Sequence, residues 1–569
     1  MTLLIERIFG RTLNEIVERH LQKQSTDEIE AWLFEDKAAR RRAEAKLRRK
    51  RVSATFRSAY KPLLCFMREE ADLDGVNEVL VRYPVHPAAH PDRFLQECYP
   101  LAMLFADIAF TFEPGTKELE YEVCLSKDGT WIRSHCVFAP NVVRNTVQGE
   151  CLCVCGWERV KGTAGEHLET EFEQLFHAAL HALQPLRQRQ LGVILIKGAI
   201  AAVDEPLGWS DEVLSFKEAL HEDLYFSIRE QRGAATVAAG GQLHARPGQI
   251  VPDIRATRGD ATLHIELSEC GDARETRGRD AVLDTADRPL KISQVRKLVL
   301  ELGHQQFAES SRWGRLSRGC YKPGTDAPVL ISAAQHANET TGVVGALRAA
   351  GELAGRKRSH FALVPVENMD GYEVHQRLIR YNPRHINHAA RYSASGDDIS
   401  SNQPVDDERA VRIEALARSK AAFHINLHGY PAHEWTRPLS GYLPKGFENW
   451  TMPKGYFLIM HHHPGWRDKA MNLMRIIVSR LAAHEELVAF NAMHIAAASA
   501  HSHETHYQVM DGMPYSLVER TQEAPPMTFV TEAQDETVYG EQFRRQQEWQ
   551  RQAVLAAYDA YQDMCRQSS

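Results

Sequence analysis

Continuous apolar strands that alternate with amphipathic helices, from about residue 290 onward, constrain the fold of this chain more than any other sequence feature. The strand candidates APVLISAAQ, SHFALVPVEN, AAFHINLHG and MTFVTEAQ are separated by helical patterns such as TTGVVGALRAAGELAG and RDKAMNLMRIIVSRLAAHEEL. This alternation is typical of a mostly parallel sheet with helices on its faces. We therefore predict an α/β fold with a mixed, mostly parallel sheet flanked by helices, and expect ligands beyond the carboxyl ends of its strands.

The length of the chain requires more than one hydrophobic core. Domains usually hold about 100–200 residues, whereas this chain has 569. The part before the alternating pattern contains helical patterns and short alternating strands, which indicates an α+β, strand-rich region. The charged segment GDARETRGRDAVLDTADRPL has almost no large apolar residues, so it is the predicted linker. The predicted segments are 1–50 (helical), 51–165 (strand-rich), 166–270 (mixed) and about 271–290 (linker), which gives an N-terminal region of unknown role over 1–285 and a catalytic domain over 286–569.

Composition and charge argue against several classes of function. The formal net charge is −7, which gives no overall reason to expect nucleic acid or an anionic membrane as a partner. The basic run at residues 36–51 has no interleaved aromatic side chains, so we interpret it as a solvated helix face. No apolar run approaches the roughly 18–20 residues that span a bilayer, and no signal-peptide core follows Met1. We expect a cytoplasmic protein, and the sequence predicts no oligomeric state.

The ten cysteines are scattered along the chain and agree with a reducing compartment. The one cluster, CLCVC at residues 151–155, places three thiols on one face of a strand. Because neighbours along one strand do not enclose a tetrahedral ion by themselves, we predict an apolar strand face there instead of a metal site.

A candidate metal site follows from polar residues at the ends of two predicted strands. His336 and Glu339 lie three residues apart where a strand turns into a helix, and His428 ends the next buried strand. Two histidines and one carboxylate, with one coordination position left for water, form the ligand set of a catalytic zinc ion. The H-x-x-E spacing alone is a weak signal and favours an ordinary capped helix start.

Five segments in order extend this pattern. QHANETTGVVGALR, VPVENMDGYEVHQRLIRY, HINLHGY, THYQVMDG and FVTEAQDET resemble the successive motifs of the zinc metallocarboxypeptidases typified by carboxypeptidase A. The resemblance covers about residues 290–540 and includes the lead-in SRWGRLSRG. It implies a divergent intracellular, bacterial-type or cytosolic carboxypeptidase-like member with an extra N-terminal domain.

The resemblance also implies roles for individual residues. His336, Glu339 and His428 match the ligands of one Zn²⁺ per chain, and Asn368, Asp370 and Gly371 match the family's N-P-D-G turn. The remaining matches are Glu532 as general base, Arg380 as the group that polarises the scissile carbonyl, Arg391 as the group that holds the substrate carboxylate, and Tyr507 as the side chain that covers bound substrate.

These roles make chemical sense without the resemblance. Zinc lowers the pKa of bound water to about 7. A carboxylate beside it can take the proton and pass it to the leaving amine, and arginine binds carboxylates bidentately.

Four positions depart from the family pattern. The family's asparagine before the carboxylate-binding arginine is Ala390, and the acid expected near the first zinc histidine is His388. The proline of N-P-D-G is Met369, and the acid before the leucine of the third ligand's motif is Asn426. Because a histidine does not replace a carboxylate as partner of a metal-bound imidazole, these departures leave the substrate class open.

The resulting functional hypothesis is a zinc metallocarboxypeptidase that removes the C-terminal residue of a peptide or peptide-like substrate. HANETTG also resembles the motif of the aspartoacylase and succinylglutamate desuccinylase group, which cleave small N-acyl amino acids. A non-catalytic binding protein on a peptidase fold is the third hypothesis. Further histidines are expected to be rim or pocket residues (His461, His462, His463, His501, His503, His506), with His433 either near the metal site or in a surface loop.

Overall fold

The computed structural model describes residues 2–23, 28–147, 149–187, 191–238, 248–269, 280–396, 398–399, 407–434, 437–441, 454–501, 507–520 and 525–567. Within these residues no helix is both long enough and apolar enough to cross a membrane.

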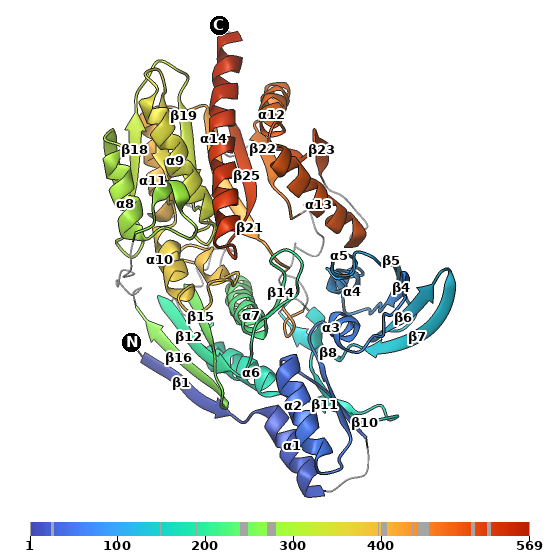
Figure 1. Cartoon of the computed structure of the whole chain (residues 1–569). Helices are drawn as coiled ribbons and strands as arrows, with labels where there is room; N and C mark the ends of the chain where they lie inside the picture. Colours follow the sequence, from blue (N-terminus) through green and yellow to red (C-terminus); the bar gives the residue numbers. More distant parts are fainter. Residues whose placement is uncertain are drawn as a thin grey trace.

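A nine-stranded mixed sheet forms the centre of the C-terminal half (Figure 1). Its central four strands are mutually parallel, and the strands on either side introduce antiparallel pairs. The mixed α/β prediction is confirmed, with the parallel part limited mainly to the centre. In spatial order the strands are β17 (Gln305–Ser310), β18 (Leu316–Lys322), β20 (Phe361–Val364), β19 (Val329–Ala333), β21 (Phe423–Pro431), β25 (Met527–Asp535), β22 (Phe457–His462), β24 (Met513–Glu519) and β23 (Gln508–Met510).

The two faces of this sheet are covered differently. One face packs in a continuous apolar core against α8 (Ile292–Glu301), α9 (Thr341–Gly355), α12 (Arg467–Leu481) and α14 (Glu541–Gln567). The other face has a small apolar cluster under α11 (Ala410–Ser419) and carries polar side chains on β21 and β25. The remaining elements of this half are η2 (Leu283–Thr285), α10 (Met369–Leu378), η3 (His388–Ala390), η4 (Asp407–Arg409) and α13 (Glu485–His501).

Among its described residues, the N-terminal half contains three four-stranded sheets, two strand pairs and the helices between them. The first sheet consists of β1 (Thr2–Phe9), β16 (Ala261–Ser268), β12 (Val193–Ile200) and β15 (Gln249–Ala256), and the second of β11 (Glu166–Leu168), β10 (Gly156–Val160), β2 (Ile29–Leu33) and β3 (Ala54–Ser58). The third sheet consists of β5 (Ala109–Pro114), β4 (Glu78–Tyr83), β6 (Glu120–Lys127) and β7 (Thr130–Phe138). The two pairs are β8 (Asn141–Thr146) with β9 (Gly149–Val154), and β13 (Glu205–Pro206) with β14 (Val213–Leu214). Its helices are α1 (Thr12–Lys23), α2 (Lys37–Arg48), α3 (Pro62–Glu69), α4 (Arg93–Glu97), α5 (Leu101–Leu104), α6 (Glu171–Leu183), η1 (Gln184–Leu186) and α7 (Phe216–Ala238).

The prediction that residues 1–50 are helical is wrong for β1 and β2. β1 pairs with β16, more than 250 residues later in the chain, and β2 pairs with β3 and β10. Such long-range pairing supplies strand partners that local periodicity does not reveal. The basic run forms α2, whose Arg40 is 1% exposed and binds the Glu69 carboxylate at 2.8 Å.

The cysteine cluster at 151–155 lies at β9, with Cys153 and Cys155 buried. This placement agrees with the predicted apolar strand face. Burial raises the pKa of Cys153 to about 12, so its thiol stays protonated at neutral pH.

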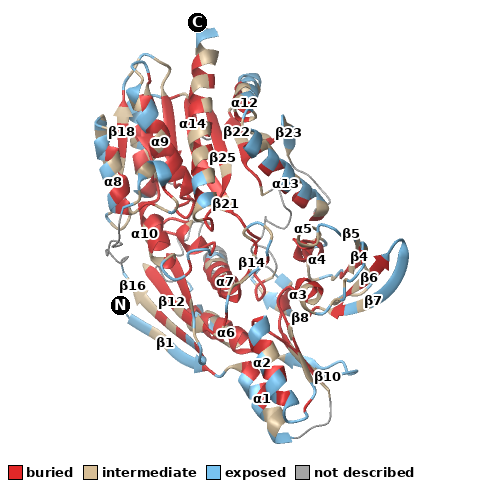
Figure 2. Cartoon of the chain, viewed as in Figure 1, coloured by how far each residue is buried: buried red, intermediate tan, exposed pale blue. Residues whose placement is uncertain are grey.

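Helix α7 joins the two halves. Figure 1 shows it at the centre of the molecule, between the large sheet and the N-terminal sheets. The apolar core of the N-terminal half includes Val374 and Leu378 from α10, while Met369 and Tyr372 of the same helix belong to the core of the large sheet. The two halves therefore share a packed boundary, which Figure 2 shows as mostly buried residues. Residues 271–279 of the predicted linker lie outside the described residues.

Candidate metal centre

The first two candidate ligands lie in the turn between β19 and α9. Ala334 takes a left-handed backbone conformation (φ 46°) directly after the strand, which redirects the chain at the edge of the sheet. The backbone N–H of Glu339 donates to the carbonyl of His336 at 3.1 Å, which brings both side chains to one side of the turn. His428 lies near the end of β21, and its carbonyl accepts a hydrogen bond from Gln550 of α14.

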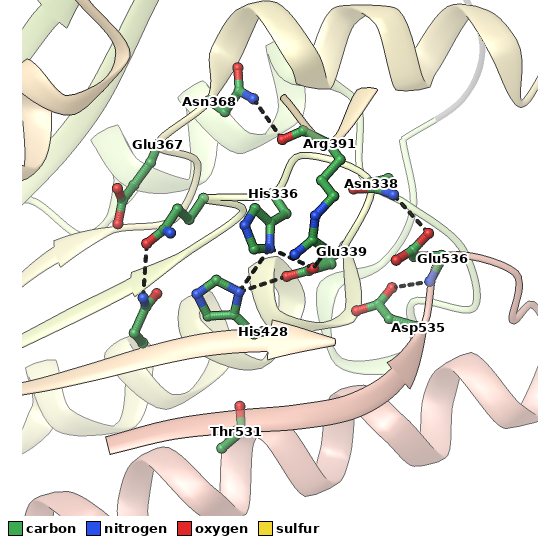
Figure 3. A network of polar contacts seen from close by, with 12 residues as sticks. His336, Asn338, Glu339, Glu367, Asn368, Arg391, His428, Thr531, Asp535 and Glu536 are labelled. Atoms are coloured by element: carbon green, nitrogen blue, oxygen red, sulfur yellow. Dashed lines mark hydrogen bonds and ion pairs between the residues drawn. The ribbon is translucent and has the colours of Figure 1, made fainter. Parts of the chain in front are cut away.

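The three side chains face one another in a buried group (Figure 3). The Nδ1 atom of His336 is 2.8 Å from Oε1 of Glu339, and Nδ1 of His428 is 3.0 Å from Oε2 of Glu339. The two Nδ1 atoms are 3.1 Å apart. Sequence reasoning therefore selected three residues that the fold brings together.

The electrostatics of this group are strongly coupled. Burial and Arg391 lower the pKa of His336, but Glu339 and Asp398 outweigh them and raise it to about 9. Burial raises the pKa of Glu339, yet the two histidines lower it further, well below its usual range. Burial lowers the pKa of His428. A carboxylate thus lies between two imidazole nitrogens, one of which holds a proton that a metal ion would displace.

The donor set fits zinc. Two imidazole nitrogens and one carboxylate oxygen within 4.8 Å of one another are the ligands that a catalytic zinc ion takes from a protein. All three residues are at most 6% exposed, so the group is held by its surroundings.

The partner of the first histidine is Asp398, which sequence reasoning missed. Its Oδ1 atom is 3.3 Å from Nε2 of His336, the ring nitrogen opposite the one that faces Glu339. A carboxylate in this place fixes the orientation of a metal-binding imidazole. Asp398 lies ten residues after the position where the family resemblance places an acid, so matching residue by residue did not find it.

His388, which occupies that position, has a different partner. Its Nδ1 atom is 2.6 Å from Oε2 of Glu222 on α7. Burial raises the pKa of Glu222 to about 8 and lowers that of His388 well below its ordinary value. A hydrogen bond between the His388 ring and the Glu222 carboxyl group therefore links the two halves of the chain.

The candidate general base, Glu532, lies beside the group on the neighbouring strand. β21 and β25 are parallel, and His428 is directly paired with Glu532 in their register. Paired residues on adjacent strands point to the same face, so both side chains lie on the polar face of the sheet. Burial raises the pKa of Glu532, Glu339 raises it further, and Arg391 opposes the shift.

The end of β25 is held against the start of α9 by Asp535. Its carboxylate accepts hydrogen bonds from the backbone N–H groups of Thr340 and Thr341, both at 2.8 Å. A side chain at Gly429 would collide with it, since an added Cβ would lie 2.5 Å from the Cβ of Asp535. These contacts connect the strand that carries Glu532 to the turn that carries Glu339.

Arg391 also contacts the candidate metal-binding group of His336, Glu339 and His428, called the metal group below. Its Nη1 atom is 3.0 Å from Oε1 of Glu339 (Figure 3). Asn368 holds this part of the chain, because its Nδ2 donates to the carbonyl of Tyr392 at 3.0 Å while its Oδ1 accepts from the N–H of Gly371. An added Cβ at Gly371 would lie 2.4 Å from the Ala390 carbonyl oxygen, so the close approach of the two segments requires glycine.

Asp370, the third residue of the N-M-D-G turn, binds the lead-in segment SRWGRLSRG. Asp370 accepts hydrogen bonds from Ser311 Oγ at 2.8 Å, from the Trp313 N–H at 3.0 Å and from Arg315 Nη1 at 2.7 Å. The N-M-D-G turn is thus a structural element that positions Arg391.

Arg380 is not brought to this site. It lies just beyond the C-terminal end of α10, is exposed, and does not line the cavity beside the metal group. The oxyanion role that the resemblance implies for Arg380 stays a prediction.

Tyr507 lies near the site but does not line the cavity. Its ring centroid is 6.0 Å from that of Phe457, which is paired with Glu532 across β22 and β25. His503 and His506 lie outside the described residues. His433 is neither a neighbour of the metal group nor a surface residue: it is 1% exposed and binds Glu218 of α7 at 2.8 Å.

A cavity of about 380 Å³ extends from the metal group over the polar face of the sheet. Its floor consists of three rows of paired residues on β21, β25 and β22. We define the first row as His428 and Glu532, the second row as Asn426, Val530 and Ile459, and the third row as His424, Thr528 and His461. The rest of the lining consists of Gln335, His336, Arg391, Asp398, Arg409, Arg412, Ile413, Leu416 and Arg520.

The comparisons with known proteins give weak likenesses. No protein-family model and no curated protein sequence matches the chain. Solved structures that resemble it include a metallo-carboxypeptidase from Burkholderia cenocepacia (12% identity, 54% of this chain and 73% of that one, TM-score 0.28). Two others are thrombin activatable fibrinolysis inhibitor (10%, 48% and 72%, 0.30) and its bovine form in complex with tick carboxypeptidase inhibitor (11%, 48% and 94%, 0.29).

Proposed function

We propose that this chain is a zinc-dependent metallocarboxypeptidase that hydrolyses the C-terminal residue of a peptide or peptide-like substrate. The observation that carries the proposal is the buried group of His336, Glu339 and His428 at the end of a cavity, with Glu532 paired to His428 on the next strand. The cytoplasmic location expected from the sequence belongs to the same proposal.

In this proposal the role of each side chain follows from its position in the site. His336 and His428 present Nδ1, and Glu339 presents its carboxylate oxygens, to one point. Asp398 holds the His336 ring from the opposite side. A bound zinc ion supplies Lewis acidity that lowers the pKa of its water and polarises the scissile carbonyl.

Glu532 is the proposed general base and acid. Its raised pKa makes its carboxylate a stronger base than an exposed glutamate, because burial disfavours the charged form. In this proposal a carboxylate oxygen of Glu532 takes the proton of the attacking water and gives it to the nitrogen of the leaving amine.

Arg391 is the cationic side chain best placed to meet negative charge on the substrate. It lines the cavity and contacts the carboxylate of Glu339 through one N–H group. A guanidinium has five N–H donors, so the same side chain can also bind a substrate carboxylate. A carbonyl-polarising role for Arg380 and a covering role for Tyr507 stay predictions.

Zinc content and hydrolysis test the proposal together. Elemental analysis of the purified protein should give one zinc per chain, and His336→Ala should abolish both metal content and hydrolysis. Glu532→Gln should keep the zinc but lower kcat by about 10²–10⁴-fold, the usual contribution of a general base. His181→Ala, on the exposed side of α6, is the matched control and should change neither.

The substrate panel separates the hypotheses. It contains peptides with a free C-terminus, the same peptides amidated, and N-acyl amino acids. Cleavage of free but not amidated peptides supports a carboxypeptidase, whereas cleavage of N-acyl amino acids alone supports the aspartoacylase-like alternative. Absence of zinc and of all hydrolysis would leave the non-catalytic binding protein.

A further inference from the structure

The carboxylates that line the cavity lie at one end of it, whereas its arginines are spread along its length. Asp398 and Glu532 are the carboxylates of the lining, and both lie at the metal end, one beside His336 and the other in the first row. Beyond the first row, the lining residues of the described chain are neutral, histidine or arginine. A cavity with this lining favours a ligand whose far end is negative.

The distance from the first row to the second row suits a single amino-acid residue. The rows are two residues apart along the strands, so the second row lies about 6.6 Å and the third row about 13 Å from the first. Val530 and Ile459 make the middle of the floor apolar, which suits the methylene part of a side chain.

Arg412 of α11 is positioned at the second row. Its Nη1 atom donates to Oε1 of Gln335 at 2.7 Å, and Gln335 accepts on the same oxygen from Asn426 of the second row at 3.0 Å. Behind it lies Glu367, which is 0% exposed, 3.3 Å from the guanidinium and not part of the lining. This arrangement fixes the guanidinium at the cavity wall.

A second arginine marks the far end. The backbone N–H of Arg520 donates to the carbonyl of His462 at 2.9 Å, next to His461 of the third row. The two arginines come from elements on different sides of the cavity, α11 and the segment after β24. A buried anion requires such partners, because an unpaired charge is costly away from water.

From this placement we infer that the residue removed by the enzyme is acidic, and that Arg412 is the side chain that recognises its side-chain carboxylate. The inference rests on the proposed function, since it assigns the second row of the same cavity. Arginine suits the task because its planar fork binds a carboxylate bidentately. The shared chemistry is an aspartate or glutamate residue joined through its α-amide, either at the end of a peptide or in a small N-acyl amino acid.

The test compares the charged residue with its uncharged isostere. Peptides that end in Glu or Gln, and N-acetyl-glutamate or N-acetyl-glutamine, are offered to the zinc-loaded full chain. The glutamate form should have a kcat/KM about tenfold or more above the glutamine form. Faster cleavage of the peptide pair identifies a carboxypeptidase substrate, and faster cleavage of the acetyl pair a small amide.

The variants separate the effect of Arg412 on substrate specificity from its effect on folding. Arg412→Gln is combined with Glu367→Gln, so that no buried charge is left without its partner. In this double variant the Glu-to-Gln ratio should fall towards one, whereas His181→Ala should leave the ratio of the wild type. A ratio near one in the wild type, or an equal loss on both substrates in the double variant, would overturn the inference while leaving the proposed function intact.

A binding measurement distinguishes failure of the acidic-residue inference from failure of the proposed function. Free L-glutamate should raise the thermal unfolding midpoint of the wild type more than L-glutamine does, and the difference should vanish in the double variant. If no substrate is cleaved but this difference is found, the proposed function fails and the acidic site stands. If neither cleavage nor the binding difference is found, both are refuted.

Discussion

The buried pair of Glu218 and His433 offers the sharpest test of how the two halves of the chain depend on each other. Glu218 lies on α7, and His433 follows β21, which carries His428. Both carboxylate oxygens of Glu218 lie within 2.9 Å of Nε2 of His433, and one also accepts from the backbone N–H of Ile386 at 3.1 Å. Neither Glu218 nor His433 is more than 5% exposed.

The perturbation is Glu218→Ala. It leaves the His433 imidazole and the Ile386 N–H buried without their partner. Removing one member of a buried ion pair typically costs about 3–5 kcal/mol, so we expect the free energy of unfolding to fall by about that amount, as measured by urea denaturation followed by tryptophan fluorescence.

The matched control is Glu301→Ala in α8. Glu301 makes an ion pair with Lys297 at 3.7 Å, and the two side chains are 55% and 66% exposed. An exposed pair contributes about 0–1 kcal/mol. If Glu218→Ala costs no more than this control, the buried pair does not join the two halves and the reasoning is wrong.

The pair also predicts a pH dependence. Burial raises the pKa of Glu218, but His433 lowers it further, below its ordinary value of 4.5. This contribution to stability is present above about pH 4.5 and is lost as the pH falls through the folded value. Burial lowers the pKa of His433, but Glu218, aided by Glu212 and opposed by Lys454, raises it above 6.5. That contribution is complete below about pH 6.5 and is lost as the pH rises through the folded value.

The pair should therefore stabilise the protein most between about pH 4.5 and 6.5. Glu218→Gln keeps the shape of the side chain and removes the charge. The wild type should lose more stability than Glu218→Gln between pH 6.5 and pH 9. Parallel stability curves for the two proteins in this range would refute the assignment.

Three further predictions concern other parts of the molecule. Asp398→Asn should weaken zinc binding by about 10–100-fold in competition with a chelator, because the carboxylate orients a metal-binding imidazole; unchanged affinity would contradict its positioning role. Gly429→Ala should lower the free energy of unfolding by about 1–3 kcal/mol, since the new Cβ would lie 2.5 Å from a side-chain carbon. The control is Gly351→Ala in α9, where an added Cβ would have nothing within 4 Å; it should be neutral or stabilising by up to about 1 kcal/mol. In the native protein at pH 8, iodoacetamide should label the exposed Cys136 and spare Cys153, whose pKa burial raises to about 12; equal labelling would show that the strand face at 151–155 is open.

Part of the candidate site could be predicted because it depends on the spacing of residues within short segments of the chain. His336 and His428 each lie at or near the end of an apolar strand, and parallel strands bring such ends to one edge of a sheet. Glu339 was found because its spacing from His336 crosses a single turn. The cavity floor also had a signal, since the segment HINLH alternates polar and apolar residues and thus implies one polar face of β21.

Other assignments depended on aligned spacing along the chain. Arg380 occupies the right place in the motif order, but it lies on the exposed side beyond α10. The family has an acid at the position of His388, whereas the carboxylate beside His336 in this chain is Asp398, ten residues further on. A motif fixes the order of residues along the chain, whereas the direction of a side chain depends on what packs around it.

By itself the sequence determined the alternation of strands and helices, the mixed sheet and the three residues of the candidate metal group, because periodicity and strand-end position are local properties. Only the tertiary structure decided that β1 pairs with β16, that α7 supplies Glu218 and Glu222 to the histidines of the C-terminal half, and that Arg412 faces the cavity. These contacts join segments that are far apart in the chain. Their free energy comes from the burial of charges and apolar surface that meet only when the whole chain is folded.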